Sequence, residues 1–234
     1  MLQAIDISFE FHSDTPAGKD PDEFSATLRR YHQILWSKPL PGGELFSLEA
    51  EPQSYLVHRS GLGVFHLTSD AITTRLLGRA WRVVNEVPPD ELPEDLGYNI
   101  GSSIIFPGNR VDGAATINGA RGFHPRIADR FDLTLECIRR HYVGQPSPLD
   151  GALRRYANFF ALFEDFSGYV DFFLLQDLVA DDGKTIRFFH TFDDFTTPAV
   201  PKTVEEYLAY VRASNEFIRA RNGRIHEWAC EHAE

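Results

Sequence analysis

The residues best suited to chemistry lie in one segment near the middle of the chain, FPGNRVDGAATINGARGFHPRIADRF, residues 106–131. Glycines at positions 108, 113, 119 and 122 permit tight turns and close approach of the backbone to a ligand. Hydrogen-bond donors are supplied by Asn109, Arg110, Asn118 and Arg121. This combination predicts a site for a small anionic molecule, such as a nucleotide or another phosphorylated compound.

A helix that follows this segment would complete the anion site. If it starts near Pro125, its free backbone N–H groups and the positive end of its dipole favour an anion, and Arg126 would lie close by. The segment matches neither the phosphate-binding loop, which ends in Gly-Lys-Ser/Thr, nor the dinucleotide-binding fingerprint. An ordered surface loop, whose polar side chains satisfy its own backbone, explains the same composition.

Asp132 and Glu136 are the candidate catalytic residues. Together with Arg139 they line one edge of the apolar stripe of the predicted helix, where side chains are half buried. A half-buried carboxylate that faces a cleft beside an arginine can act as a general base or orient a substrate, so Arg139 is a candidate ligand-binding residue. The alternative is an ion-pair ladder on the helix surface, because Asp132, Glu136 and Arg140 follow i, i+4 spacing.

Two further motifs suggest metal ligands, and the sequence supports neither. Asp14, Asp20 and Asp22 could hold a hard cation, but they lack the spacing of an EF-hand, and helix capping already explains Asp20. The stretch HEWACEH, residues 226–232, begins like the zinc-protease motif His-Glu-x-x-His. Cys230 stands where the second histidine belongs. We therefore predict no metal site.

Composition indicates a folded globular protein. Of the 234 residues, 43% are hydrophobic and 13% are aromatic, which is far from the profile of a disordered chain. This length predicts a single domain over residues 1–234. The net charge of −11 argues against a general nucleic-acid binder, because affinity for the phosphate backbone comes from lysine and arginine.

The sequence also predicts a cytoplasmic location. It contains neither a signal peptide nor an apolar run of about 18 residues, so we expect no membrane association. Cys137 and Cys230 lie far apart and match no paired-thiol or zinc pattern, which favours a reducing compartment. We expect the Cys137 thiol to be packed in the core.

Periodicity and turn residues predict a strand-rich N-terminal half with mostly antiparallel pairing. The segment AIDISFEF, residues 4–11, alternates apolar and polar positions and predicts a first strand. An amphipathic helix is expected over residues 21–36, because Asp20, Pro21 and Glu23 form a helix-start signal. Further strands are expected at residues 43–49, 54–58, 63–69 and 102–106.

The C-terminal half is predicted to be rich in helices, which makes the fold α+β. Helices are expected over residues 125–142 and 149–166, the second ending near Ser167, and a last helix is expected after the capping pair Thr203 and Glu206. The apolar run at residues 169–179 is compatible with a buried helix or a buried strand. A strand is predicted at residues 185–192.

Four stretches of the chain resemble a family of uncharacterised bacterial proteins, described as a domain of unknown function. They are DPDEFSATLRRYHQILWSKPLPGG, FPGNRVDGAATINGARG, DRFDLTLECIRRHY and GYVDFFLLQDLV. The resemblance extends from about residue 5 to residue 225. It implies a single bacterial domain and carries over no activity, cofactor or catalytic residue.

Two classes of function follow from the sequence. The favoured one is a binder of, or an enzyme acting on, a small anionic ligand at residues 106–131. The alternative is a non-catalytic interaction or regulatory module, in which the phenylalanine-rich region 159–195 forms a surface. The cofactor and the oligomeric state are left open.

Overall fold

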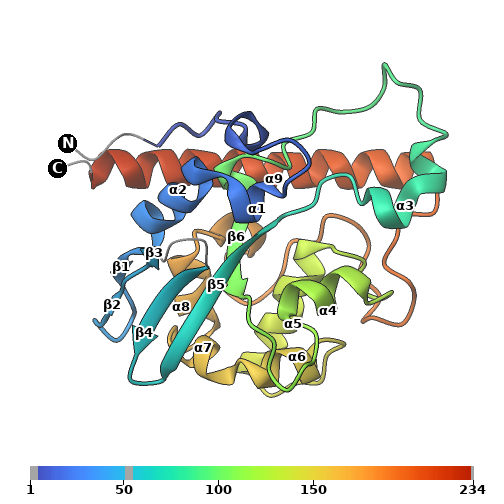
Figure 1. The fold of residues 1–234 in the computed structure, drawn as a ribbon. Coiled ribbons are helices and arrows are strands. Elements are labelled where there is room, and N and C mark those ends of the chain that lie inside the picture. Colours follow the sequence, from blue (N-terminus) through green and yellow to red (C-terminus); the bar gives the residue numbers. More distant parts are fainter. Residues whose placement is uncertain (1–4, 51–54, 233–234) are drawn as a thin grey trace.

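The strands form two antiparallel sheets in the N-terminal half of the computed structural model, which describes residues 5–50 and 55–232 (Figure 1). β1 (Lys38–Pro39) pairs with β2 (Leu45–Phe46). The larger sheet has the order β3 (Glu49–Ala50), β4 (Leu56–Ser60), β5 (Gly63–Ala71) and β6 (Ser103–Pro107). The predicted strands at residues 63–69 and 102–106 correspond to β5 and β6, and the described part of the one at 54–58 overlaps β4, residue 54 lying outside the described residues. The strand predicted at 43–49 is divided between β2 and β3, which belong to different sheets.

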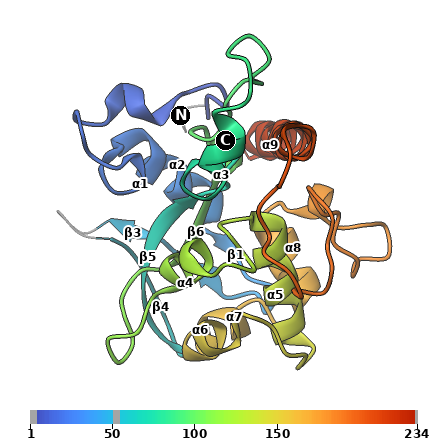
Figure 2. The ribbon, with the colours of Figure 1, turned by 90° about the vertical axis from the view of Figure 1, so that its right-hand side faces the viewer.

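Helices dominate the C-terminal half, as the sequence predicts, and the fold is α+β. The N-terminal half contains α1 (Pro21–Phe24), α2 (Ala26–Trp36) and α3 (Leu77–Val84). The helices that follow are α4 (Ile117–Phe123), α5 (Phe131–Tyr142), α6 (Asp150–Arg155), α7 (Ala157–Ala161), α8 (Phe166–Phe172) and α9 (Val204–Glu231). Short 3₁₀ helices occur at Phe11–Asp14, Ile100–Ser102 and Gln176–Leu178. Figure 2 shows α9 end-on, with α8 and α5 below it.

The strand predicted at residues 4–11 is wrong for the residues that the structure describes. The Asp6 carboxylate accepts hydrogen bonds from the backbone N–H of Ser8 at 2.9 Å and from its hydroxyl at 2.6 Å, which bends the chain into a turn. Ile5 and Phe11 are nevertheless buried. The alternating pattern therefore identified apolar contacts correctly but assigned them to the wrong backbone conformation, because local side-chain bonds compete with strand pairing.

The strand predicted at residues 185–192 is also wrong. Ile186 forms only an isolated bridge to Val179. Further on, the N–H of Phe189 donates to the Asp132 carboxylate at 2.9 Å, and the carbonyl oxygen of His190 accepts from Arg130 at 3.1 Å. Side chains from α5 and the turn before it thus bind the backbone groups that a strand partner would otherwise bind.

The helix boundaries differ from prediction where the backbone leaves the helical region. The helix predicted over residues 21–36 is divided at Ser25, where the backbone is extended. The Ser25 hydroxyl accepts a hydrogen bond from the Leu28 N–H and so caps α2. The helix predicted from residue 125 begins at Phe131, since Ala128 and Asp129 have φ of 49° and 65°. The sequence analysis did not predict α4.

The segment 149–179 is helical but is divided differently from the prediction. α6 and α7 cover its first part, and α8 starts at residue 166, where the preceding helix was expected to end. Asp165 caps α8 by accepting from the Gly168 N–H at 2.8 Å. The ambiguous run 169–179 contains the second half of α8 and a 3₁₀ turn, so it is not a strand.

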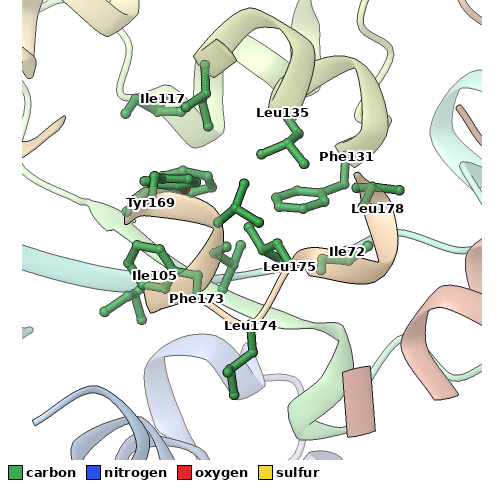
Figure 3. Packing of buried hydrophobic residues seen from close by; sticks show 14 of the residues in the cluster. Ile72, Ile105, Ile117, Phe131, Leu135, Tyr169, Phe173, Leu174, Leu175 and Leu178 are labelled. Atoms are coloured by element: carbon green, nitrogen blue, oxygen red, sulfur yellow. The ribbon is translucent and has the colours of Figure 1, made fainter. Parts of the chain in front are cut away.

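The hydrophobic core lies between the sheet and the C-terminal helices (Figure 3). Ile117 of α4, Leu135 of α5, Tyr169 of α8 and Ile105 of β6 converge there. The phenylalanines of α7 and α8 and the turn between them also belong to this core, and each is almost completely buried: Phe159, Phe160, Phe163, Phe166, Phe172 and Phe173. Much of the region that could have formed an interaction surface is therefore in the interior.

Arg221 of α9 connects three parts of this core. Its guanidinium is fully buried and donates to the backbone oxygens of Gly101 and Ser103, at 2.9 and 2.7 Å, and of Phe173, at 3.1 and 3.2 Å. Ser103 begins β6, the outer strand of the sheet. No carboxylate pairs with Arg221 in the described chain, and burial lowers its pKa to about 9. Without Arg221 these buried carbonyl oxygens would lack this hydrogen-bond donor, which explains why the charge is retained in the interior.

We expect Arg221→Met to destabilise the protein by about 3 kcal/mol or more, because it leaves three buried carbonyl groups without their donor. Urea unfolding followed by circular dichroism measures the change. Arg219→Met is the matched control on the same helix. Arg219 is exposed and pairs with Glu94 at 3.2 Å, so this variant should lose less than about 1 kcal/mol. Equal stability of the two variants would contradict the role assigned to Arg221.

Candidate functional site

Arg121 lies at the centre of a carboxyl cluster where α4 approaches the end of β5. Its side chain is 0% exposed, and one terminal nitrogen lies 2.5 Å from Asp70 and 2.9 Å from Asp129. The other terminal nitrogen donates to the backbone oxygen of Asp129 at 2.9 Å, and Nε donates to the Thr134 hydroxyl at 3.1 Å. The side chains of Asp70 and Asp129 are 22% and 34% exposed. A buried cation therefore holds two carboxylates at the protein surface.

Asp22 of α1 adds a third carboxyl group to this cluster. Burial, with the charges of Asp70 and Asp20, raises the pKa of Asp22 to about 8, although Ser69 and Arg121 act in the opposite direction. Burial also raises the pKa of Asp70, and the charge of Asp129 adds to that effect, while Arg121 opposes it. Asp22 therefore holds a proton at neutral pH next to carboxylates that are paired with arginine.

The backbone around Asp129 has an uncommon conformation. Ala128 and Asp129 are consecutive non-glycine residues in the left-handed region, with φ of 49° and 65°, and Leu76 nearby in space has φ of 47°. Such residues persist where surrounding contacts fix them, and they are frequent at functional sites. Here the fixing contacts are those of Arg121, together with a hydrogen bond from the Thr73 hydroxyl to Asp129 at 2.8 Å.

A cavity of about 600 Å³, which we call the Asp129 cavity, adjoins the cluster. Its walls come from the segment after β5, from residues 95–98 and from the turns around α4, and they include Thr73, Arg75, Leu76, Asp95, Tyr98, Gly122, Phe123 and Asp129. Phe123 is 79% exposed. Burial and the charges of Asp95 and Asp22 raise the pKa of Tyr98. The volume lies within the usual range for small-molecule sites.

A chain of buried hydrogen bonds extends from α2 to the sheet. Trp36 Nε1 donates to His32 Nδ1 at 2.8 Å, and His32 Nε2 lies 2.8 Å from the Ser69 hydroxyl. Because burial lowers the pKa of His32 to about 3, the ring is neutral. Its Nδ1 accepts from Trp36, so its Nε2 carries the proton and donates to Ser69. His32 therefore cannot serve as the base for a Ser69 nucleophile, and the Ser69 hydroxyl also lies 2.6 Å from the Ser103 hydroxyl of β6.

The residues that the sequence analysis grouped as one predicted ligand-binding site lie apart in the structure. Asn109 and Arg110 are exposed in the loop after β6. The side-chain nitrogen of Asn118, in α4, lies 3.4 Å from the backbone oxygen of Ser69. Arg126 is exposed beyond α4, whereas Arg121 is buried between two carboxylates. These side chains do not converge on one point, and their shared role in ligand binding stays a prediction.

Asp132, Glu136 and Arg139 lie on α5, and each has a structural partner. Asp132 is fully buried and pairs with Arg130 at 2.5 Å. Glu136 accepts from Arg139 at 2.7 Å and from Arg140 at 2.6 Å. Of the surface ladder that the sequence suggested as the alternative, only the i, i+4 pair of Glu136 and Arg140 is present, because Asp132 is buried and pairs with Arg130. Catalysis by Asp132 or Glu136 remains a prediction that no contact described here requires.

Sequence reasoning overlooked the role of Asp22, Asp70 and Asp129 as one cluster. Asp22 was considered only as a metal ligand, with Asp14 and Asp20. Asp14 instead accepts from the Ser25 hydroxyl at 2.5 Å and from the Thr27 N–H at 2.8 Å. One signal in the sequence was Asp70, an acidic residue that directly follows the predicted strand GVFHLTS.

Three further properties of the described residues concern metal ligands, membrane-spanning helices and thiols. Residues 5–50 and 55–232 contain no group of three histidine, cysteine, aspartate or glutamate side chains arranged to hold a metal ion. Within the same ranges, no helix has the length and apolar character needed to cross a membrane. Cys137 is buried and Cys230 is exposed, and both are free thiols.

The fold and the site define an α+β protein in which a carboxyl cluster borders a cavity large enough for a small molecule. A family model described as a family of unknown function (DUF6994) matches residues 5–225, and the chain belongs to this family. This match confirms the resemblance that the sequence motifs indicated. No curated protein and no solved structure matches the chain.

The raised pKa of Asp22 predicts a pH-dependent stability. Folded Asp22 keeps its proton up to about pH 8, whereas the unfolded carboxyl loses it near its ordinary value of 3.8. The folded state thus binds more protons between these values, so its stability falls as pH rises through this window. Asp22→Asn removes that loss. One pKa unit corresponds to about 1.4 kcal/mol, and partial exposure reduces the full effect, so we expect the variant to gain about 2 kcal/mol over the natural protein between pH 5 and pH 8.

Urea unfolding at pH 5, 6.5 and 8 measures this difference. Asp90→Asn is the control, since Asp90 is exposed outside the cluster, and its difference from the natural protein should be the same at all three pH values. A constant difference for Asp22→Asn as well would show that the Asp22 carboxyl is ionised throughout.

Proposed function

We propose that this chain binds a small molecule in the Asp129 cavity and exchanges a proton with it through the carboxyl cluster. The observation that carries the proposal is the double position of Asp129. Its carboxylate lines the cavity and at the same time pairs with the buried guanidinium of Arg121. A concave site bordered by groups with perturbed pKa values is the combination that functional sites require.

The charges around the cavity favour an uncharged or cationic ligand that carries hydroxyl or amino groups. Arg75 is the basic residue among the described lining residues, and it already lies 3.2 Å from Asp95. Asp129 and Asp95 offer carboxylate oxygens as hydrogen-bond acceptors. Tyr98 and Phe123 add aromatic surface for the apolar parts of a ligand or for a cation. The anionic ligand that the sequence favoured suits this cavity less well, since Arg121 is already neutralised by its two partners.

The cluster also supplies the two components of general acid–base catalysis. Asp22 holds a proton at neutral pH, because its pKa is about 8. The Asp129 carboxylate accepts hydrogen bonds from Thr73 and Arg121 and faces the cavity, so it is the candidate proton acceptor. Neighbouring carboxyl groups with different environments divide the roles of acid and base in many hydrolytic and isomerising enzymes. We assign the chain to this broad class of chemistry.

A thermal-shift screen with two probe sets, neutral sugars and primary alkylamines, tests binding. We expect at least one probe to raise the melting temperature of the natural protein in a saturable way, because a ligand of the native state stabilises it by mass action. Asp129→Asn should weaken that binding at least tenfold, and Phe123→Ala should weaken it several-fold. Asparagine tolerates the left-handed conformation of residue 129, so the backbone should be preserved.

Asp112→Asn is the matched control for Asp129→Asn. Asp112 is exposed in the same 106–131 segment and has φ of 52°, so the two substitutions are equivalent in chemistry and in backbone conformation. This variant should bind as the natural protein does. The proposal fails if no sugar or amine shifts the melting temperature, or if Asp129→Asn and Asp112→Asn behave alike.

A further inference from the structure

A second cavity lies under the segment 186–203, which we call the strap. This segment has no regular secondary structure and is fixed to the neighbouring α5 region. Arg130 donates to the backbone oxygens of His190 and Ala199, at 3.1 and 3.2 Å, and Arg140 pairs with Asp194. Beneath the strap is a cavity of about 100 Å³. We call it the strap cavity.

Several basic side chains border the strap cavity, and two of them, Arg126 and Lys202, are exposed. Its lining includes Arg126, Arg130, His190, Thr191, Lys202 and Glu206. Arg130 is neutralised by Asp132, at 2.5 Å. The side chains of Arg126 and Lys202 are exposed and make no ion pair or hydrogen bond with the described part of the chain. Arg126 and Lys202 therefore border one small cavity and make no direct ion pair with a carboxylate of the described residues, although the charge of Lys202 helps to lower the pKa of Glu206.

The two acidic residues of the lining are already engaged by the strap and by the start of α9. Asp193 accepts from the N–H groups of Thr196 and Thr197, at 3.2 and 3.0 Å, and from the Thr197 hydroxyl at 2.6 Å. Glu206 accepts from the N–H of Lys202 at 2.7 Å, and its carboxylate lies 3.8 Å from His190 Nε2. Carboxylates that are bound to backbone donors attract a neighbouring cation less strongly. The cationic side chains of the lining therefore attract an anion into the cavity.

We propose that the strap cavity binds a tetrahedral oxyanion with the chemistry of phosphate or sulfate, held by Arg126, Lys202 and His190. The volume is far below the ~300 Å³ at which pockets accept drug-sized molecules, so only the anionic group itself enters. The anion is either a free ion or the terminal phosphoryl group of a larger molecule that extends into solvent. This site is separate from the Asp129 cavity, and neither proposal depends on the other.

His190 provides a readout specific to this site. Burial and the charge of Arg130 lower its pKa, whereas Glu206 and Asp132 act in the opposite direction and Lys202 adds to the lowering. These are the charged groups that face it from α5, the turn before α5 and the start of α9. A bound oxyanion favours the imidazolium form, so binding should raise the pKa of His190, and affinity should increase as pH falls from 7.5 to 6.

Isothermal titration with sodium sulfate, against sodium chloride at equal ionic strength, tests the site. Sulfate keeps its charge over this pH range, which leaves His190 as the titrating partner. We expect saturable sulfate binding, at least tenfold weaker in Arg126→Ala and in Lys202→Ala. His190→Gln should retain binding and lose most of its dependence on pH. Because the substituted cations are exposed, these variants should fold normally.

Arg110→Ala is the matched control, since Arg110 is an exposed arginine of the same segment as Arg126 but lies outside the strap cavity. It should bind sulfate as the natural protein does. Heat changes for sulfate that equal those for chloride, or equal affinity in Arg126→Ala and Arg110→Ala, would overturn the proposal.

A parallel titration with inorganic phosphate and methyl phosphate identifies the source of the anion. Tighter binding of the ester supports the phosphoryl group of an organic molecule, and tighter binding of inorganic phosphate supports the free ion. Both results support the site. Failure of both anions to bind would overturn it, whatever the outcome at the Asp129 cavity.

Discussion

Buried irregular backbone is the constraint on which the rest of this structure depends. Long segments between the helices and strands pass through or beside the core, and their carbonyl groups need donors where no strand or helix partner exists. Three arginines that are 0–1% exposed supply these donors. Arg121 binds the backbone of Asp129, Arg130 binds that of His190 and Ala199, and Arg221 binds that of Gly101, Ser103 and Phe173. A planar guanidinium with five donors suits this task better than any other side chain.

The candidate chemistry follows from how each buried charge is balanced. Arg221 is held by carbonyl oxygens in the described chain, and its uncompensated charge helps keep His32 neutral. Arg121 gathers Asp70 and Asp129 at the surface, and burial, with the nearby charge of Asp70, raises the pKa of Asp22, the third carboxyl group. The same kind of residue thus stabilises the interior at one position and organises a carboxyl cluster at another. At Arg121 the same guanidinium binds buried backbone and holds the carboxyl cluster in place.

The sequence was most informative where one element could be recognised from its own residues. The capping pair Thr203 and Glu206 predicted the start of α9, and the apolar positions of that helix are buried as expected, including Tyr207 and Val211. β-prone runs bounded by turn residues predicted β4 and β5 for the same reason. The strand predictions failed at residues 4–11 and 185–192, where apolar side chains are buried but other groups bind the backbone. Burial periodicity reports which side chains enter the core, and it does not report the partner of each N–H and C=O group.

The sequence by itself determined the α+β class, the antiparallel strands, the main helices and the family of the chain. It also drew attention to residues 106–131, which contribute Gly122, Phe123 and Asp129 to one cavity and Arg126 to another. Only the tertiary structure decided which charges are neutralised and which remain available. Arg121 and Arg126 are five positions apart and look alike in the sequence, yet one is buried between carboxylates from β5 and the turn before α5, and the other faces solvent. The physical reason is that the ionic environment of a side chain is set by residues distant in sequence, which no local pattern contains.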